Sequence, residues 1–220
     1  MDFTKFKQYP KKISCIFNRF PLSMGFAVLT AVIAIFLYHA TSAYDFFEHH
    51  EKLISWIILF PTLSIFLAAA TKLLQEAQGY TPKKGWIISI ASEVVLCILS
   101  ASIIMFSTPE ADSFAPKIIV FSAIVAISPL VVPFFKNKND LPLWNFIGKT
   151  IISLCVSIVV TLLFYGAVIG LVQLAHILTE LSFFFDDLYA DIGFFCGYVV
   201  FPILFFTGLP NLSEPDENRE

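Results

Sequence analysis

The chain has 220 residues, of which 57% are hydrophobic, 16% are aromatic and only 14% are charged. Soluble domains carry charge on about a quarter of their residues, so a water-soluble fold of this length has too little polar surface to cover so much apolar material. The formal net charge is −3, and the lysines and arginines are dispersed. This pattern excludes a basic nucleic-acid-binding surface, and no nucleic-acid partner is expected.

The apolar residues form blocks of about the length that an α-helix needs to cross a hydrocarbon core of roughly 30 Å. The predicted spans are residues 22–40, 53–74, 86–106, 118–135, 151–172 and 192–209. We therefore predict an all-α fold, a polytopic membrane helix bundle of about six transmembrane helices.

The predicted bundle defines three segments of the chain. Residues 1–20 are expected to form a cytoplasmic amphipathic segment, because five basic residues accompany apolar residues at helical spacing. Residues 21–210 form the transmembrane domain, and residues 211–220 form a polar C-terminal tail. The first apolar run is longer than the 7 to 15 residues of a typical signal-peptide core, which predicts an uncleaved first helix.

Prolines and periodicity predict where the bundle is irregular. Pro61 predicts a kink in the second span, whereas Pro129 and Pro133 predict that the fourth span unwinds before its loop. The apolar periodicity of the fifth span continues to Leu181. This helix is therefore expected to project past the bilayer or to bend onto its surface.

The lysines and arginines also predict the orientation of the chain. With six spans, twelve of them fall on the side of the N-terminus, and only Lys52 and Lys117 fall on the other side. Basic residues are enriched in cytoplasmic loops. We therefore expect both termini in the cytoplasm.

Glu93 is the one acidic residue well inside an apolar block, and such a residue suggests a function by default. A polar stripe on the same helical face contains Ser89, Ser92, Cys97 and Ser100. One interpretation is a proton or cation relay. The favoured alternative is a structural ion pair with Lys149, which lies at a comparable depth in the fifth span.

The fifth span contains two small-residue patterns on different faces. Gly166 and Gly170 form a GxxxG motif, while Ser153, Ser157 and Thr161 recur at four-residue intervals. Small residues allow helix backbones to approach closely. Both patterns therefore predict helix packing, within the chain or between two copies of it.

A third group of residues lies in the predicted outer half of the protein. His49, His50 and His176 accompany Asp45 and Glu48, and imidazole with carboxylate can bind a zinc-type cation. No HExxH spacing supports a metal site, however, and acidic outer loops are expected once basic residues are on the inner side. The sequence also lacks GxSxG, P-loop and dinucleotide-binding motifs, so no catalytic residue is assigned and no cofactor is expected.

Several short motifs occur in order along the chain. They are Arg19-Phe20-Pro21, Trp56 before Phe60-Pro61, Asp140-Leu141-Pro142-Leu143-Trp144, Phe201-Pro202 and Leu209-Pro210. With these motifs the chain resembles the N-terminal membrane region of domain of unknown function 4153, a family of bacterial multi-pass membrane proteins. The resemblance implies the bacterial inner membrane, and a short member or a fragment, but it implies no activity and no site residues.

Three functional hypotheses follow. The first is a non-enzymatic membrane component that acts through helix packing or partner binding, with the lipid bilayer, other membrane subunits or a second copy as partners. The second is a small transporter or channel that uses Glu93 and the polar face of the third helix. The third is a membrane enzyme or metal-binding protein that uses the outer histidine and acidic residues.

Overall fold

A computed structural model describes residues 16–43, 51–106, 111–134, 140–179, 185–210 and 212, which are helical over most of their length. The helices are α3 (Pro21–Ala43), α4 (Glu51–Gln78), α5 (Pro82–Phe106), α6 (Ala111–Val131), α7 (Asp140–Thr179), α8 (Phe185–Phe195) and α9 (Phe201–Gly208). Six helical stretches, the last combining α8 and α9, are long and apolar enough to cross a membrane. The predicted all-α bundle of six transmembrane helices is confirmed.

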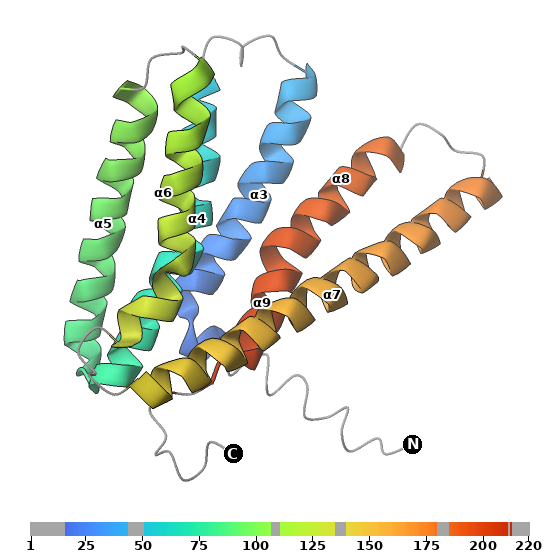
Figure 1. Cartoon of the computed structure of the whole chain (residues 1–220). Coiled ribbons are helices and arrows are strands. Elements are labelled where there is room, and N and C mark those ends of the chain that lie inside the picture. Colours follow the sequence, from blue (N-terminus) through green and yellow to red (C-terminus); the bar gives the residue numbers. More distant parts are fainter. Residues whose placement is uncertain are drawn as a thin grey trace, which may run out of the picture.

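Helix α4 is the centre of the first four helices. It contacts α3, α5 and α6, which stand around it in Figure 1. Ala68, Ala69 and Ala70 of α4 are consecutive and all buried. Since successive residues of an α-helix point about 100° apart, burial of all three means that neighbours cover most of the circumference of α4 at this level.

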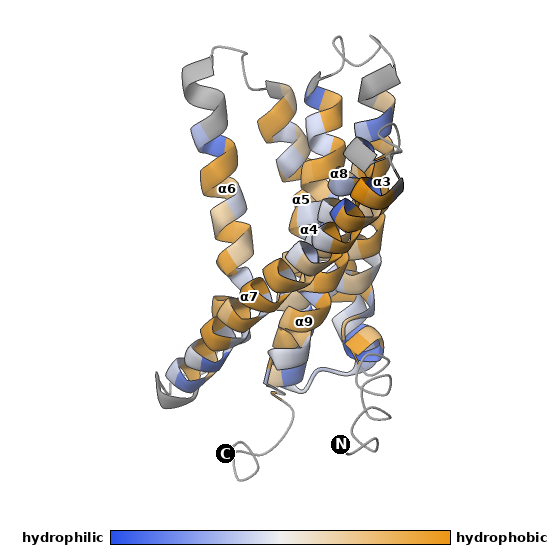
Figure 2. Cartoon of the chain, turned by 90° about the vertical axis from the view of Figure 1, so that its right-hand side faces the viewer, coloured by the Kyte–Doolittle hydropathy of each residue, from blue (hydrophilic) through white to orange (hydrophobic). Residues whose placement is uncertain are grey.

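The last three helices form a second group along α7. Helix α7 contacts α8 and α9 and is inclined to the first group, crossing in front of it in Figure 2. Its apolar stretch has 36 residues, equivalent to about 54 Å at 1.5 Å per residue. This exceeds a hydrocarbon thickness of about 30 Å, and a long helix can meet that mismatch by tilting. The predicted excess length is present, in one continuous helix that ends at Thr179.

Proline positions explain two local departures from α-helical geometry. Helix α6 contains Pro129 in its last turn and passes into a 3₁₀ turn, η2 (Val132–Phe134), so the predicted unwinding of the fourth span is present. Between α8 and α9 lies a π-helical turn, η3 (Cys196–Val200), in which the N–H of Phe201 donates to the carbonyl of Cys196. Pro202 follows directly and has no N–H to donate. The sequence analysis did not predict this wider turn.

The main hydrophobic core lies at the end of the bundle where the N-terminal segment enters. It contains Ile16, Phe20, Met24, Ala27, Ile65, Ala69, Leu73, Phe134, Phe146, Phe205, Phe206 and Leu209. The rings of Phe20 and Phe206 stack with their centroids 5.0 Å apart. This core holds the start of α3 against the ends of α4 and α9, and it positions the polar contacts described next.

Candidate functional site

Arg19 joins three segments of the chain that are distant in sequence. Its Nε and Nη2 atoms donate to the two carboxylate oxygens of Glu76 at 2.9 and 2.7 Å. Its Nη1 and Nη2 atoms also donate to the backbone carbonyls of Leu209 and Pro210 at 3.0 and 2.8 Å. The side chains of Arg19 and Glu76 are only 19% and 10% exposed. The guanidinium group therefore uses all three of its nitrogen atoms in a largely buried contact.

Local sequence explains why these groups meet. Pro21 restricts the backbone of Phe20, and the short helical segment before it ends at Arg19. At the other end of the chain Leu209 is extended, so α9 stops there and leaves carbonyl groups without intrahelical partners. Arg19 donates to the carbonyls of Leu209 and Pro210, the two residues that directly follow α9. From the sequence, Arg19 counted only as one of the basic residues on the cytoplasmic side and as part of a motif. No sequence pattern singled out Glu76.

The polar stripe of α5 faces α4. Gln75 donates from Nε2 to the hydroxyl of Ser89 at 3.3 Å, and Ser89 donates to Thr71 Oγ1 at 2.9 Å. Thr71 in turn donates to the carbonyl of Ala68 at 3.0 Å. The hydroxyl of Ser92 donates to the backbone carbonyl of Ser89 within the same helix. The stripe therefore forms a chain of hydrogen bonds at the N-terminal half of α5.

The same stripe continues at the opposite half of α5. Ser100 is buried, donates to the carbonyl of Cys97 at 3.1 Å, and accepts a hydrogen bond from Trp56 Nε1 at 3.1 Å. The Trp56 ring stacks on Phe60 at 5.8 Å. Indole N–H groups usually find an acceptor when they are buried. The stripe thus joins α5 to α4 at both ends.

Glu93 lies between these two hydrogen-bonded regions. Both of its carboxylate oxygens are buried and have no hydrogen-bond partner in the part of the chain that the structure describes. Ser64 of α4 is a polar neighbour of this carboxyl group, and its hydroxyl likewise has no hydrogen-bond partner among the described residues. A buried polar group without a partner is unusual and costly.

The predicted ion pair between Glu93 and Lys149 is not formed. Lys149 is exposed on α7, which packs against α8 and α9 rather than against α5. The two residues lie at a comparable depth in their spans, but depth does not determine which helices are neighbours. Helix α5 packs against α4 instead.

The two small-residue patterns of α7 have different environments. Ser153, Ser157 and Thr161 are all buried, and Ser153 donates to the carbonyl of Phe205 at 3.1 Å. Gly166 and Gly170 are exposed, and no described atom lies within 4 Å of a Cβ added at either residue. The serine face therefore packs on α9, whereas the predicted packing of the GxxxG motif is not found within the part of the chain that the structure describes.

Gly208 makes the close helix approach that the GxxxG motif does not make. A Cβ at Gly208 would overlap the Ser153 hydroxyl and would lie 2.8 Å from Ser153 Cβ. The sequence analysis missed this residue because its partner lies on another helix. The signal available was the small side chain at position 153, which indicates a close neighbour without identifying it.

The outer histidine and acidic residues are only partly described. His49, His50, Asp45 and Glu48 fall outside the described residues, so the predicted metal site stays a prediction. His176 lies on α7 and is half-buried. Elsewhere on the predicted outer side, His39 Nε2 of α3 lies 3.0 Å from a carboxylate oxygen of Asp191 in α8. Among the described residues, no group of three or more histidine, cysteine or acidic residues is placed to hold a metal ion.

These contacts describe how six helices are held together, and they include no constellation typical of catalysis in the described part of the chain. No protein-family model, curated protein or solved structure matches the chain. The geometry described above is therefore the basis on which a function can be proposed. That geometry is the geometry of a multi-pass membrane protein with an α-helical membrane domain.

Proposed function

We propose that this protein is a non-enzymatic membrane component that acts by binding, and that α7 binds α7 of a second copy of the chain. The observation that carries the proposal is the exposed GxxxG motif. Leu163, Gly166, Gly170 and Ile177 follow one another at spacings of three, four and seven residues, so they share one face of α7. All four are exposed, and the glycines form a notch between larger apolar side chains.

This face of α7 can pack against the same face of α7 in a second copy of the chain. Small residues let two membrane helices approach closely, and association there depends on packing because lipid is as apolar as the helices. Helix α7 is also the least buried of the six candidate spans. An isologous contact between identical faces closes after two subunits. A homodimer is therefore the occupant that we propose for this face.

The oligomeric state of purified protein tests this proposal. We expect the wild type to be a dimer by light scattering in detergent, and Gly166→Leu to be a monomer because leucine fills the notch. The matched control is Gly148→Leu on the same helix, where an added Cβ also meets nothing within 4 Å. A monomeric wild type, or a dimer that tolerates Gly166→Leu, contradicts the proposal.

Glu93 supports a second candidate function, transport of a proton or small cation. Its two buried oxygens lack partners in the described chain, and hydrogen-bonded hydroxyl groups lie on either side of it along the α4–α5 contact. Intramembrane acids commonly mark proton or ion paths. The proposal requires that Glu93 exchange protons or ions across the bilayer.

Flux into vesicles tests this candidate. We expect a pH-driven proton flux in the reconstituted wild type that falls at least about tenfold in Glu93→Gln, since the amide cannot carry a proton in the same way. Ser102→Ala is the control, because the Ser102 hydroxyl lies outside the polar stripe and donates to the carbonyl of Ile98 within its own helix. Equal flux in wild type and Glu93→Gln removes Glu93 from any transport mechanism.

The location that we propose is the bacterial inner membrane, with both termini in the cytoplasm. Its supports are the resemblance to the bacterial family and the division of basic residues between the two sides, twelve against two. Membership of that family is likewise a proposal, based on the short motifs. In the structure two of those motifs meet, because Arg19 donates to the carbonyls of Leu209 and Pro210.

A further inference from the structure

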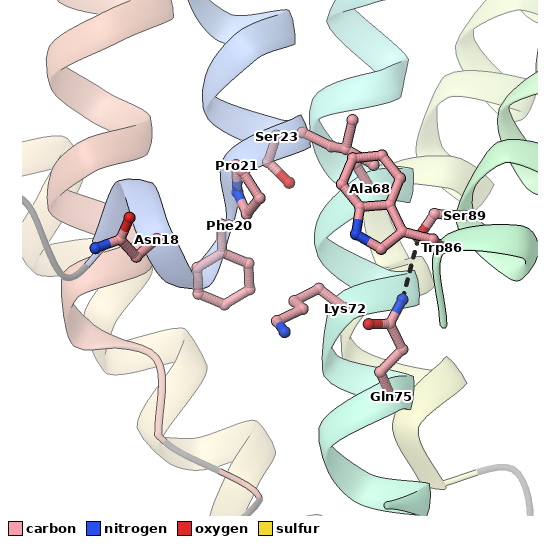
Figure 3. Close-up of a pocket in the computed structure, with 10 residues that line it drawn as sticks. Asn18, Phe20, Pro21, Ser23, Ala68, Lys72, Gln75, Trp86 and Ser89 are labelled. Atoms are coloured by element: carbon pink, nitrogen blue, oxygen red, sulfur yellow. Dashed lines mark hydrogen bonds between the residues drawn. The ribbon is translucent and has the colours of Figure 1, made fainter. Parts of the chain in front are cut away.

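A small pocket lies between the beginning of α3, the second half of α4 and the beginning of α5. Its volume is about 140 Å³, which is several times the roughly 30 Å³ that a water molecule occupies in the liquid. Its lining includes Asn18, Pro21, Ser23, Lys72 and Trp86 (Figure 3). Asn18, Pro21 and Trp86 are exposed, so the pocket opens to the surroundings.

Ser23 points to a missing ligand in this pocket. The residue is only 1% exposed, and its hydroxyl oxygen has no hydrogen-bond partner among the described residues. In Figure 3 this oxygen is directed into the space between α3 and α4. A helix also leaves the N–H groups of its first turn without intrahelical acceptors, and Leu22 and Ser23 belong to that turn of α3. The wall of the pocket formed by α3 therefore offers hydrogen-bond donors.

Lys72 supplies a positive charge from the opposite wall. It is the only ionisable residue among those that line the pocket, so no carboxylate there repels an anion. Figure 3 shows its side chain extending from α4 into the same space as Ser23. In the described part of the chain no acidic residue pairs with it.

The Arg19–Glu76 contact explains why Lys72 does not pair with Glu76. Glu76 follows Lys72 by four residues on α4, which is the spacing at which a lysine and a glutamate can pair on a helix surface. Arg19 instead holds both carboxylate oxygens of Glu76 in a bidentate pair. Arg19 thus neutralises the nearby acid and leaves the Lys72 ammonium group for another anion.

We infer that this pocket binds the phosphate group of an anionic lipid headgroup. A phosphate group has several oxygens, which can accept from the ammonium group, from the hydroxyl and from the first turn of a helix together. A lipid is its source because the pocket lies at one end of membrane helices and has Trp86, a residue type typical of the membrane interface, at its rim.

Thermal unfolding in nanodiscs tests this inference. The bilayers are phosphatidylcholine with increasing fractions of phosphatidylglycerol, and the variants are Lys72→Gln and its control Lys84→Gln, an exposed lysine outside the pocket. We expect phosphatidylglycerol to raise the melting temperature of the wild type and of Lys84→Gln. Lys72→Gln should require about tenfold more phosphatidylglycerol for the same rise, since it loses a charge-assisted hydrogen bond.

Ser23→Ala gives a second test, because it should raise the melting temperature without phosphatidylglycerol but weaken the rise that phosphatidylglycerol causes. In pure phosphatidylcholine this variant should melt at a higher temperature than the wild type, because it removes a buried hydroxyl without a partner. Its response to phosphatidylglycerol should nevertheless weaken. An equal response of Lys72→Gln and Lys84→Gln, or no response of the wild type, overturns the inference. Inorganic phosphate that reproduces the full rise in phosphatidylcholine, at matched ionic strength, overturns the lipid as the source.

This inference is independent of the proposed dimer. The pocket involves α3, α4 and α5, whereas the proposed dimer contact involves α7. A monomeric wild type that still shows the Lys72-dependent response would contradict the dimer alone. A dimer without that response would contradict the lipid site alone.

Discussion

At the scale of single residues, Arg19 has the most informative contacts. Four N–H groups of its guanidinium donate to Glu76 and to the carbonyls of Leu209 and Pro210, out of five that an arginine offers. Lysine has a compact charge with three donors and cannot form the same planar, two-pronged pair. The geometry therefore requires arginine at position 19, not merely a positive charge.

We expect Glu76→Gln and Arg19→Lys each to lower the free energy of unfolding by about 2–4 kcal/mol, because each leaves a largely buried charge or carbonyl without its partner. Chemical denaturation in detergent micelles measures this change. Lys84→Gln, an exposed lysine, is the control and should change stability by less than about 0.5 kcal/mol. A double-mutant cycle in which Arg19→Gln and Glu76→Gln are additive would show that the two side chains do not stabilise each other.

At the scale of helices, α7 shows that similar sequence patterns can have different roles. Its serine and threonine face is buried against α9, while its GxxxG face is exposed. Both patterns consist of small residues at four-residue intervals, and both are compatible with packing. What separates them is the position of α9, whose Gly208 lies against Ser153.

We expect Gly208→Ala to destabilise the protein by about 1–3 kcal/mol, because the new Cβ would overlap Ser153. Gly148→Ala on α7 is the matched control, since its added Cβ meets nothing within 4 Å and alanine favours a helix by up to about 1 kcal/mol. The free energies of unfolding of both variants measure the effect. Adding Ser153→Gly to Gly208→Ala should restore part of the stability; failure to do so would mean that this contact is not the cause.

At the scale of the whole molecule, the bundle consists of two groups of helices that differ in how they are packed. Helix α4 is surrounded by α3, α5 and α6, whereas α7 contacts mainly the α8–α9 pair and leaves most of its apolar surface exposed (Figure 1). Exposed apolar side chains are ordinary where a helix faces lipid. An even number of spans also returns the chain to the side from which it started.

Cysteine labelling tests the topology of the whole chain. In a variant without native cysteines, we expect single cysteines at Pro109 and Ser182 to react with a membrane-impermeant maleimide in intact cells. Cysteines at Tyr80 and Asn137 should react only after permeabilisation, because the proposed orientation places those loops in the cytoplasm. The reverse pattern would invert the orientation, and equal labelling at Tyr80 and Pro109 would contradict the span between them.

The sequence by itself determined the number of spans, their approximate limits and two of their irregularities. These features depend on the length and apolar content of local segments and on the missing N–H of proline, which are properties of neighbouring residues. The unwound end of α6 and the excess length of α7 could therefore be predicted from Pro129, Pro133 and the apolar run to Leu181.

Only the tertiary structure decided which side chains meet. Arg19 and Leu209 are 190 residues apart in the chain, and no local pattern specifies that one caps the carbonyl of the other. The same holds for Glu93, because helices that reach the same depth need not be neighbours, and α4 rather than α7 packs beside α5. Contacts between spans depend on which face of each helix turns inward, and that choice is made by the whole bundle at once.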